Sequence, residues 1–513
     1  MSRTEKFIKN TIGAAVLQSV TLAVGFIIPH VLLVHYGSEV NGLISSLTQF
    51  ISYFSLLEAG LSGAVVFSLY KPLAQGQTDE ISGIVAGAKR FYIQTGYFFC
   101  IFVLLLAFLY PVLVYAQHLT QTEIFLLTLI LGTNGALEFF TLAKYRSILT
   151  ADQRTYVISC SNVIHLALYA LIVCLTASGG LNIVMVRFLA LFSISVRTLL
   201  LMLYCRKHYR YLNFNAKPNT GALKQRWDVF YQQLLAAVQS GMPIILTTVI
   251  LGLKSVSVYT VYYLVIGGIN GIMGIFTNGL SAGFGDVIAR KETDKLNSLI
   301  REFEVIYYFL LSAAYSVTLV MILPFIRLYT RNITDVTYEI PSIAFLFVLS
   351  GFCYCMKAPQ SVLVIAAGKY KETRTQSTAA ALIITGGGII LAFPFGLHGI
   401  VAASILSDLY RTWALLLFVT KHITALPLQE SCGRILRAFI VCAITVLPYL
   451  LFPWSADNII QWIMRALLVG IHALILAFLN VLVFEPRQLK YLFKRIQSFF
   501  KKEGTTYGSI SSK

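Results

Sequence analysis

The sequence predicts an all-α polytopic membrane protein with about fourteen transmembrane helices. The chain has 513 residues, of which 57% are hydrophobic and only 12% are charged, and its mean hydropathy is +0.75. A soluble chain of this length needs a polar surface that this composition does not supply. Runs of about 20 apolar residues, each long enough to cross roughly 30 Å of hydrocarbon as a helix, recur along the whole chain.

Fourteen apolar runs are separated by polar loops and by tight turns such as Ser178-Gly179-Gly180. The predicted spans are 11–34, 40–69, 91–114, 121–144, 155–177, 181–205, 229–252, 258–282, 303–327, 340–366, 377–394, 396–420, 434–454 and 458–484.

The distribution of Lys and Arg predicts the orientation of these spans. With the N-terminus placed inside, and with basic residues at the ends of spans counted with the adjoining segments, the inner segments hold 32 of the 40 basic residues, the outer loops hold three, and the span interiors hold five. Basic residues are enriched in cytoplasmic loops of membrane proteins, so both termini are expected to be cytoplasmic. The net charge of +18 is thereby attributed to membrane topology rather than to nucleic-acid binding.

Similar short patterns recur at a spacing of about 215 to 221 residues. Gly60-Leu61-Ser62 returns as Gly279-Leu280-Ser281, and Thr78-Asp79 returns as Thr293-Asp294. Further matches are Gln18-Ser19 with Gln239-Ser240, and Ala151-Asp152-Gln153-Arg154 with Ala367-Gly368-Lys369-Tyr370. The spacing predicts two six-span repeats of the same topology, related by an axis along the membrane normal.

The repeat predicts five parts. They are an N-terminal six-helix lobe (1–205), a cytoplasmic linker (206–228), a C-terminal six-helix lobe (229–420), two additional transmembrane helices (421–484) and a basic cytoplasmic tail (485–513). In the tail, apolar residues recur at helical spacing between lysines and arginines, which favours an amphipathic helix on the anionic inner leaflet. A merely solvated basic tail is the alternative.

Charged residues inside a bilayer are costly and are therefore candidates for function. The bases in the span interiors are Arg187, Arg197, Lys357, Arg411 and Arg465, and the acids are Glu58, Glu138 and Asp408. The first four bases are candidates to line a substrate cavity, and Arg187 and Arg197, about 80° apart around one helix, are expected to face it at different depths. An excess of cations suits an anionic cargo, because arginine holds phosphate oxygens in a bidentate manner. A transporter of drug cations would need the opposite balance.

Each candidate also has a structural interpretation. Arg197 and Arg465 can extend to the head groups, and Lys357, beside Pro359, can bind a backbone carbonyl. Asp408 and Arg411 stand at i and i+3, which predicts a self-neutralising pair.

The remaining polar candidates also leave two interpretations open. Glu58, Glu138 and Asp408 are candidates to bind a coupling proton or sodium ion, or to pair with the bases. Gln18, Gln239, Asn134 and Asn278 are candidates to bind sugar hydroxyls or to join helices.

Several motifs resemble one known family. These are Leu69-Tyr70-Lys71-Pro72-Leu73-Ala74 after the second span, and Tyr145-Arg146-Ser147 with Ala151-Asp152-Gln153-Arg154 after the fourth. With the fourteen spans and the repeat, they resemble the polysaccharide flippases of the MOP exporter superfamily. These are the Wzx-type O-antigen and capsule flippases, which are related to lipid II flippases and to MATE exporters.

This resemblance implies two six-helix bundles in a V-shaped arrangement in the bacterial cytoplasmic membrane, opening alternately to each side. It implies an oligosaccharide on a polyprenyl diphosphate as cargo, with membrane lipids and a polysaccharide polymerase as possible partners. Twelve-span MATE exporters share that fold, so the last two spans favour the flippase branch.

Two alternatives are a MATE-like antiporter of drug or metabolite cations and a membrane polysaccharide polymerase or ligase. The first requires an acidic cavity. The second would be expected to carry a large outer loop with catalytic residues, whereas no predicted outer loop exceeds roughly a dozen residues, so we expect no enzymatic activity. The chain has no Walker A sequence, and its eight cysteines lack zinc-site spacing. We therefore expect no cofactor, no metal and no nucleic-acid partner.

Overall fold

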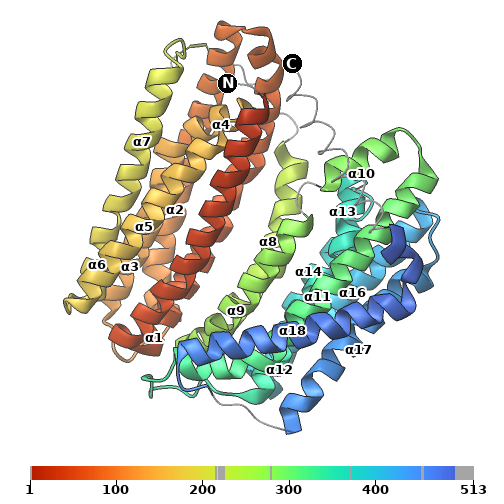
Figure 1. The fold of residues 1–513 in the computed structure, drawn as a ribbon. Helices are drawn as coiled ribbons and strands as arrows, with labels where there is room; N and C mark the ends of the chain where they lie inside the picture. Colours follow the sequence, from red (N-terminus) through yellow and green to blue (C-terminus); the bar gives the residue numbers. More distant parts are fainter. Residues whose placement is uncertain are drawn as a thin grey trace, which may run out of the picture. The chain divides into compact units, whose positions relative to one another are not determined.

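The computed structural model describes residues 3–213, 216–217, 226–277, 280–369, 371–451 and 456–491, excluding the side chains of 3–4, 7, 55–64, 226–230, 232–233 and 281–282. All regular structure in these ranges is helical (Figure 1). Residues 214–215 and 218–225 of the predicted linker (206–228) lie outside the described residues, and so does the predicted tail helix beyond residue 491.

The first half of the chain forms eight α-helices and a π-helical turn. They are α1 (Arg3–Gln75), α2 (Thr78–Leu113), α3 (Gln121–Leu137), η1 (Glu138–Leu142), α4 (Ala143–Ala151), α5 (Thr155–Ser178), α6 (Ile183–Ala190), α7 (Phe192–His208) and α8 (Arg226–Leu246).

The second half continues with ten further α-helices and two π-helical turns. They are η3 (Thr247–Leu251), α9 (Leu253–Thr277), α10 (Leu280–Ala289), α11 (Thr293–Tyr329), α12 (Pro341–Met356), α13 (Ala358–Ala366), α14 (Arg374–Leu382), η4 (Ile383–Gly387), α15 (Gly388–Phe395), α16 (Leu397–His422), α17 (Leu428–Leu451) and α18 (Ile459–Phe484).

Thirteen continuous stretches of the described helices are long and apolar enough to cross a membrane. One of them, in α1, contains a kink at Gly37, where φ is 79° and ψ is 177°. The kink divides α1 into two helices that correspond to the first two predicted spans, and counting them separately gives fourteen. The predicted fold class, an all-α polytopic membrane protein, is confirmed.

A loop residue stabilises this kink. A helix that restarts after a kink leaves backbone N–H groups without partners, and a side-chain oxygen can accept from them. Asp335, which belongs to the loop between α11 and α12, accepts from the Ser38 backbone N–H at 2.9 Å and from the Ser38 hydroxyl at 2.7 Å. Gly37 supplies the left-handed conformation that other residues rarely adopt.

Residues with positive φ show that the turns repeat. The eight such residues in the described part of the chain form four pairs. The pairs are Gly37 with Gly252, Gly76 with Lys291, Gln153 with Gly368, and Gly180 with Gly396. The first three pairs are 215 residues apart (252 − 37, 291 − 76 and 368 − 153), and the fourth is 216 apart (396 − 180). The spacing predicted from the short sequence matches therefore recurs in the backbone.

The chain folds into two compact units. Unit 1 comprises Met1–Leu264 with Asn332–Thr337 and Ala392–Ile400, and unit 2 comprises Val265–Arg331, Tyr338–Leu391 and Val401–Lys513. The division falls inside α9, so α8 and the first part of α9 pack within unit 1.

The second part of α1 packs closely against the start of α9 within unit 1. A Cβ atom on Gly42 would lie 2.0 Å from the Leu253 carbonyl oxygen, so only glycine fits this crossing. The Asn41 amide donates to the Ser257 hydroxyl at 2.8 Å. Buried polar side chains thus join helices where there is no water to satisfy them.

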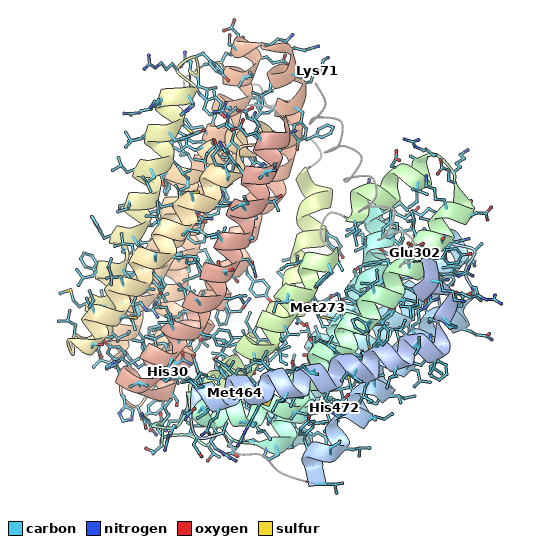
Figure 2. All side chains as sticks on the ribbon, viewed as in Figure 1. His30, Lys71, Met273, Glu302, Met464 and His472 are labelled. Carbon is cyan, nitrogen blue, oxygen red and sulfur yellow. The ribbon has the colours of Figure 1, made fainter. Side chains whose placement is uncertain are left out.

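In unit 2, α11 packs against α17 and α18, the two predicted additional helices. His472 on α18, labelled in Figure 2, has its ring centroid 5.8 Å from that of Tyr449 on α17. Met464, also labelled there, is 61% exposed, like many apolar residues along α18. An apolar exposed face is what a helix in contact with lipid requires.

Candidate functional site

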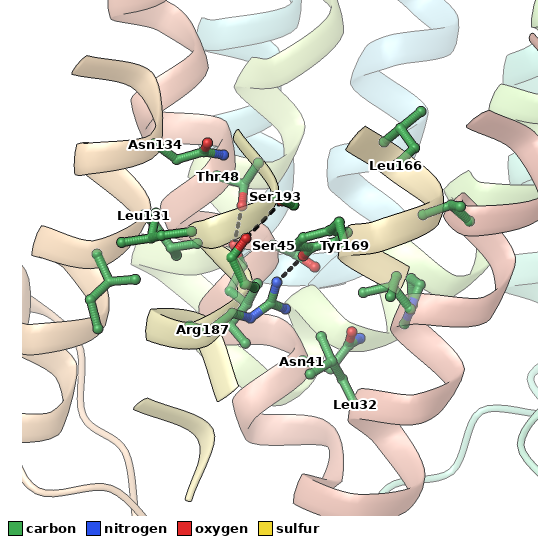
Figure 3. Close-up of a pocket in the computed structure, with 18 of the residues that line it drawn as sticks. Leu32, Asn41, Ser45, Thr48, Leu131, Asn134, Leu166, Tyr169, Arg187 and Ser193 are labelled. Atoms are coloured by element: carbon green, nitrogen blue, oxygen red, sulfur yellow. Dashed lines mark hydrogen bonds between the residues drawn. The ribbon is translucent and has the colours of Figure 1, made fainter. Parts of the chain in front are cut away.

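A cavity of about 480 Å³ with a mixed polar and apolar lining lies in unit 1, between α1, α3, α5, α6 and the start of α7 (Figure 3). Its polar and ionisable lining residues are Asn41, Ser45, Thr48, Gln49, Ser52, Asn134, His165, Tyr169, Arg187 and Ser193. The apolar lining includes Ile28, Leu32, Leu131 and Leu166. Such a volume is within the range of roughly 300–1,000 Å³ that is usual for small-ligand sites.

Arg187 supplies the cavity with a positive charge. It lies in the last turn of α6, where the helix carbonyls favour a cation, and it is only 4% exposed. Its guanidinium donates through Nη1 to the Tyr169 hydroxyl on α5 and lies over the Tyr169 ring, 5.9 Å from the centroid (Figure 3). Its Nε is buried and has no hydrogen-bond partner. The guanidinium is therefore oriented by a neutral group, the Tyr169 hydroxyl, and its Nε–H still lacks an acceptor.

The rest of the lining is rich in amides and hydroxyls. Asn134, a sequence candidate for binding sugar hydroxyls, lies in the cavity wall, and Gln49 lies in the wall from α1. His165 also lines the cavity, and its Nδ1 is buried without a hydrogen-bond partner. None of the described lining residues is acidic. The cavity is thus cationic and suited to hydrogen-bond a hydroxylated ligand.

Arg197, predicted to share a cavity with Arg187, is instead engaged in an ion pair. It donates through Nη1 to Glu138 Oε1 at 2.6 Å, and Arg146 Nη1 lies 3.5 Å from Glu138 Oε2. Glu138 begins the π-helical turn η1 that interrupts the fourth predicted span. Pairing, the structural interpretation of Glu138, therefore holds in this structure, and Arg197 does not line this cavity.

The prediction that Asp408 and Arg411 neutralise each other is wrong. Asp408 on α16 pairs instead with Lys357, which stands at the break between α12 and α13. Lys357 also lies over the Tyr354 ring, 4.5 Å from its centroid. Because Lys357 stands at a helix break, its side chain is able to turn toward α16. The i,i+3 spacing of Asp408 and Arg411 on one helix does not predict such a contact between helices.

The two ion pairs occupy corresponding places with their charges exchanged. In unit 1 the acid, Glu138, is at the interruption of the fourth predicted span, and the base, Arg197, is on the sixth. In unit 2 the base, Lys357, is at the interruption of the tenth, and the acid, Asp408, is on the twelfth. Each pair therefore joins an interrupted helix to the last helix of its repeat.

The other predicted residues lie away from the cavity. Arg411 donates to the Thr373 carbonyl at 3.2 Å and to the Gln376 side chain at 3.4 Å. Gln18 on α1 and Gln239 on α8 are both half-buried, and neither lines this cavity. The side chain of Glu58 and the whole of Asn278 lie outside the described residues.

The sequence analysis missed the most deeply buried acid of the described residues. Glu304 on α11 is 1% exposed. It accepts from Arg434 Nη1 at 2.8 Å, from the Ser431 hydroxyl at 2.8 Å and from the Gln360 amide at 3.0 Å. Arg434 also contacts Glu485 after α18, with Nε 3.1 Å from Oε1. This cluster, which we call the α11–α17 clamp, joins the two additional helices to α11.

A second polar cluster surrounds Asp152 at the turn between α4 and α5. The carboxylate accepts from Lys6 Nζ at 2.9 Å and from the Tyr209 hydroxyl at 2.6 Å, and Arg154 Nε lies 2.7 Å away. Burial alone would raise the pKa of Asp152, but the hydrogen bonds from Tyr209 and Lys6 and the charge of Arg154 together lower it. The cluster ties the N-terminal end of α1 to the residues that follow α7.

The described residues contain no group of three or more His, Cys, Asp or Glu placed to hold a metal ion. The eight cysteines, all of which lie in the described ranges, are free thiols.

No protein-family model and no curated protein matches the sequence. Solved structures do match. An inward-facing multidrug resistance MATE family transporter of the MOP superfamily is 14% identical, with a TM-score of 0.66 over 82% of this chain and 99% of that one. The lipid II flippase MurJ, in an inward closed conformation, is 14% identical, with a TM-score of 0.65 over 94% of this chain and 100% of that one.

The chain has the fold of MOP superfamily transporters. A MOP superfamily transporter from Pyrococcus furiosus also matches at 14% identity, with a TM-score of 0.57 over 84% of this chain and 95% of that one. Identities this low establish the fold, that of a multi-pass membrane protein, and leave the function to be inferred from the residues of this chain.

Proposed function

We propose that the protein is a flippase that moves a polyprenyl-diphosphate-linked oligosaccharide across the bacterial cytoplasmic membrane by alternating access. The exported unit would serve surface polysaccharide biosynthesis, such as O-antigen or capsule, with both termini in the cytoplasm. Its activity is transport rather than enzymatic catalysis, and a polysaccharide polymerase is the partner that would consume the exported unit.

The observation that carries this proposal is the composition of the unit 1 cavity. Its guanidinium, Arg187, has no carboxylate partner among the described lining residues, and amides and hydroxyls surround it. Hydroxyl-rich sugars bind through many neutral hydrogen bonds, and an anionic group binds through a cation. The lining therefore fits a cargo that is both hydroxylated and negatively charged.

The same lining argues against a transporter of drug cations. A cation placed beside Arg187 would meet a like charge at low dielectric, without an acid among the described lining residues to offset it. In the Pyrococcus furiosus transporter, a binding pocket of reverse polarity suggests a different function for that protein. The polarity of the cavity is therefore a reasonable basis for choosing between cargo classes on this fold.

We further propose that the interrupted spans couple transport to an ion. Asp408 is paired with Lys357, and Glu138 is paired with Arg197. Protonation of either acid would release its base, and the interrupted helix would then be free to move relative to the last helix of its repeat. Glu58 remains a third candidate for this role.

Export from a strain lacking the native gene tests the proposal. Each variant is expressed from a plasmid at equal membrane levels, and surface polysaccharide is measured. Arg187→Ala should lose most export, Arg187→Lys should retain part of it, and the matched control Arg465→Ala on α18 should be mild. The double variant Arg187→Ala, Lys357→Ala should be the most impaired. Full export by this double variant would refute the proposed role of the charges.

A further inference from the structure

We infer that the unit 1 cavity binds an acidic sugar of the oligosaccharide, a residue with one carboxylate, rather than the diphosphate. This inference rests on the proposed function and assigns one part of the cargo to one site. It depends on a match between the cavity and the sugar in charge, in hydrogen-bonding groups and in size.

The charge of the cavity matches a single anion. Among the described lining residues, Arg187 is the only one with a permanent charge. A diphosphate linking two groups carries two negative charges on adjacent phosphates, so one guanidinium would leave the second charge uncompensated. Such a charge is costly away from water. One carboxylate leaves no excess charge of either sign.

A neutral sugar fits the cavity less well than an acidic one. It would displace water from Arg187, which is 4% exposed and whose Nε already lacks a partner. A buried guanidinium deprived of both water and a counter-charge is destabilised. A carboxylate supplies two acceptor oxygens that match the planar guanidinium in bidentate geometry. Arg187 therefore favours an acidic sugar over its neutral analogue.

The neighbouring side chains match the rest of a sugar ring. Asn134 on α3 offers an amide, which donates and accepts, and Ser45 and Thr48 offer hydroxyls (Figure 3). Gln49 on α1 offers a second amide. His165 adds a buried ring nitrogen without a partner. Vicinal sugar hydroxyls need such alternating donors and acceptors, whereas phosphate oxygens need donors only.

The cavity volume of about 480 Å³ sets the size of the bound group. It lies within the usual small-ligand range, roughly 300–1,000 Å³, and suits a short glycan segment rather than a complete lipid-linked oligosaccharide. Tyr169 acts as a positioning residue, because its hydroxyl accepts from Arg187 and fixes the direction of the remaining donors.

Binding to the purified full-length protein in detergent micelles tests the inference. The probes are cellobiouronic acid, the neutral disaccharide cellobiose and inorganic pyrophosphate, measured by isothermal titration calorimetry. Hydrogen bonds to a charged group contribute about 1.5–3 kcal/mol, so Arg187→Gln should weaken cellobiouronic acid binding by roughly 10- to 150-fold. Binding of cellobiose to the native protein should be weaker than that of the acid and should not be weakened further in this variant.

Tyr169→Phe provides a milder second variant that keeps the ring and removes the orienting hydroxyl. It should weaken binding of the acid severalfold and leave cellobiose binding unchanged, even if Arg187→Gln fails to fold. Pyrophosphate binding should not depend on either residue. Absence of cellobiouronic acid binding to the native protein, equal binding of the two disaccharides, or loss of pyrophosphate binding in Arg187→Gln would each overturn the inference.

A flipping assay separates this inference from the proposed function. Liposomes containing the protein are given a polyprenyl diphosphate carrying either disaccharide. If neither lipid is flipped but acid binding still depends on Arg187, the proposed function fails and the inference stands. If both are flipped equally by the native protein and by Arg187→Gln, the proposed function stands and the inference fails.

Discussion

Replacing Arg434 by methionine should destabilise the packing of the two additional helices, α17 and α18, against α11. The effect should exceed that of removing any solvent-exposed charge. Arg434 and Glu304 are 4% and 2% exposed as side chains, and Nη1 lies 2.8 Å from Oε2. Removing one partner of such a buried pair costs about 3–5 kcal/mol, because the other charge stays buried without compensation. For a compact unit of this size, that corresponds to a fall in melting temperature of about 6–20 °C.

The assay is the thermal unfolding of the purified protein in detergent, followed by intrinsic fluorescence. The control is Arg290→Met, which removes a partner of Asp286 at 3.1 Å where both side chains are more than 60% exposed. Exposed pairs contribute about 0–1 kcal/mol, so this control should melt within a few degrees of the native protein. Adding Glu304→Gln to Arg434→Met should recover most of the loss. Equal melting temperatures for Arg434→Met and Arg290→Met would refute the importance of the clamp.

Three further outcomes are expected. Asp408→Asn should abolish the dependence of transport on the coupling ion and leave cellobiouronic acid binding intact. If transport by this variant in liposomes still follows an imposed ion gradient, Asp408 is excluded from coupling. Asp152→Asn should destabilise the protein at pH 7, because the folded pKa of Asp152 is lowered. The stability that the ionised carboxylate contributes is lost as the pH falls through the folded pKa, so native and variant melting temperatures should converge in acid. A difference in melting temperature that stays constant with pH would contradict the role of the Asp152 charge. A cysteine at Lys217 should react with an impermeant maleimide only in inverted vesicles, and labelling in intact cells would refute the predicted orientation.

The fold could be predicted from the sequence because each helix has its own local signal. Runs of about 20 apolar residues and the turns between them depend on neighbouring residues only. The first two predicted spans follow one another in α1 without a loop, and only the kink at Gly37 separates them. The predicted spacing of the repeat likewise depended on residues such as Thr78 and Thr293, which begin α2 and α11.

The site was less predictable because it depends on how helices face one another. Arg187 was correctly singled out as a buried base. Asn134 was named as a candidate to bind sugar hydroxyls, but nothing in the sequence placed it and Arg187 in one cavity. Asp408 was paired with its neighbour on the same helix, whereas the structure pairs it with Lys357 from another. Glu304 was missed because it stands near the start of a predicted span, where acids are common.

The pairing of the left-handed residues has a consequence for how such a chain can change over time. Inserting one residue into a helix rotates everything beyond it by 100° and turns a lipid-facing side chain inward. Between Gly37 and Gln153 and between Gly252 and Gly368 the chain covers the same number of residues, although few side chains agree. The two repeats therefore share their helical phase. Substitutions should be tolerated far more readily than insertions or deletions of a single residue, because substitutions leave this phase unchanged. A deletion scan through α2 and α11 should leave export intact only when whole turns are removed from both.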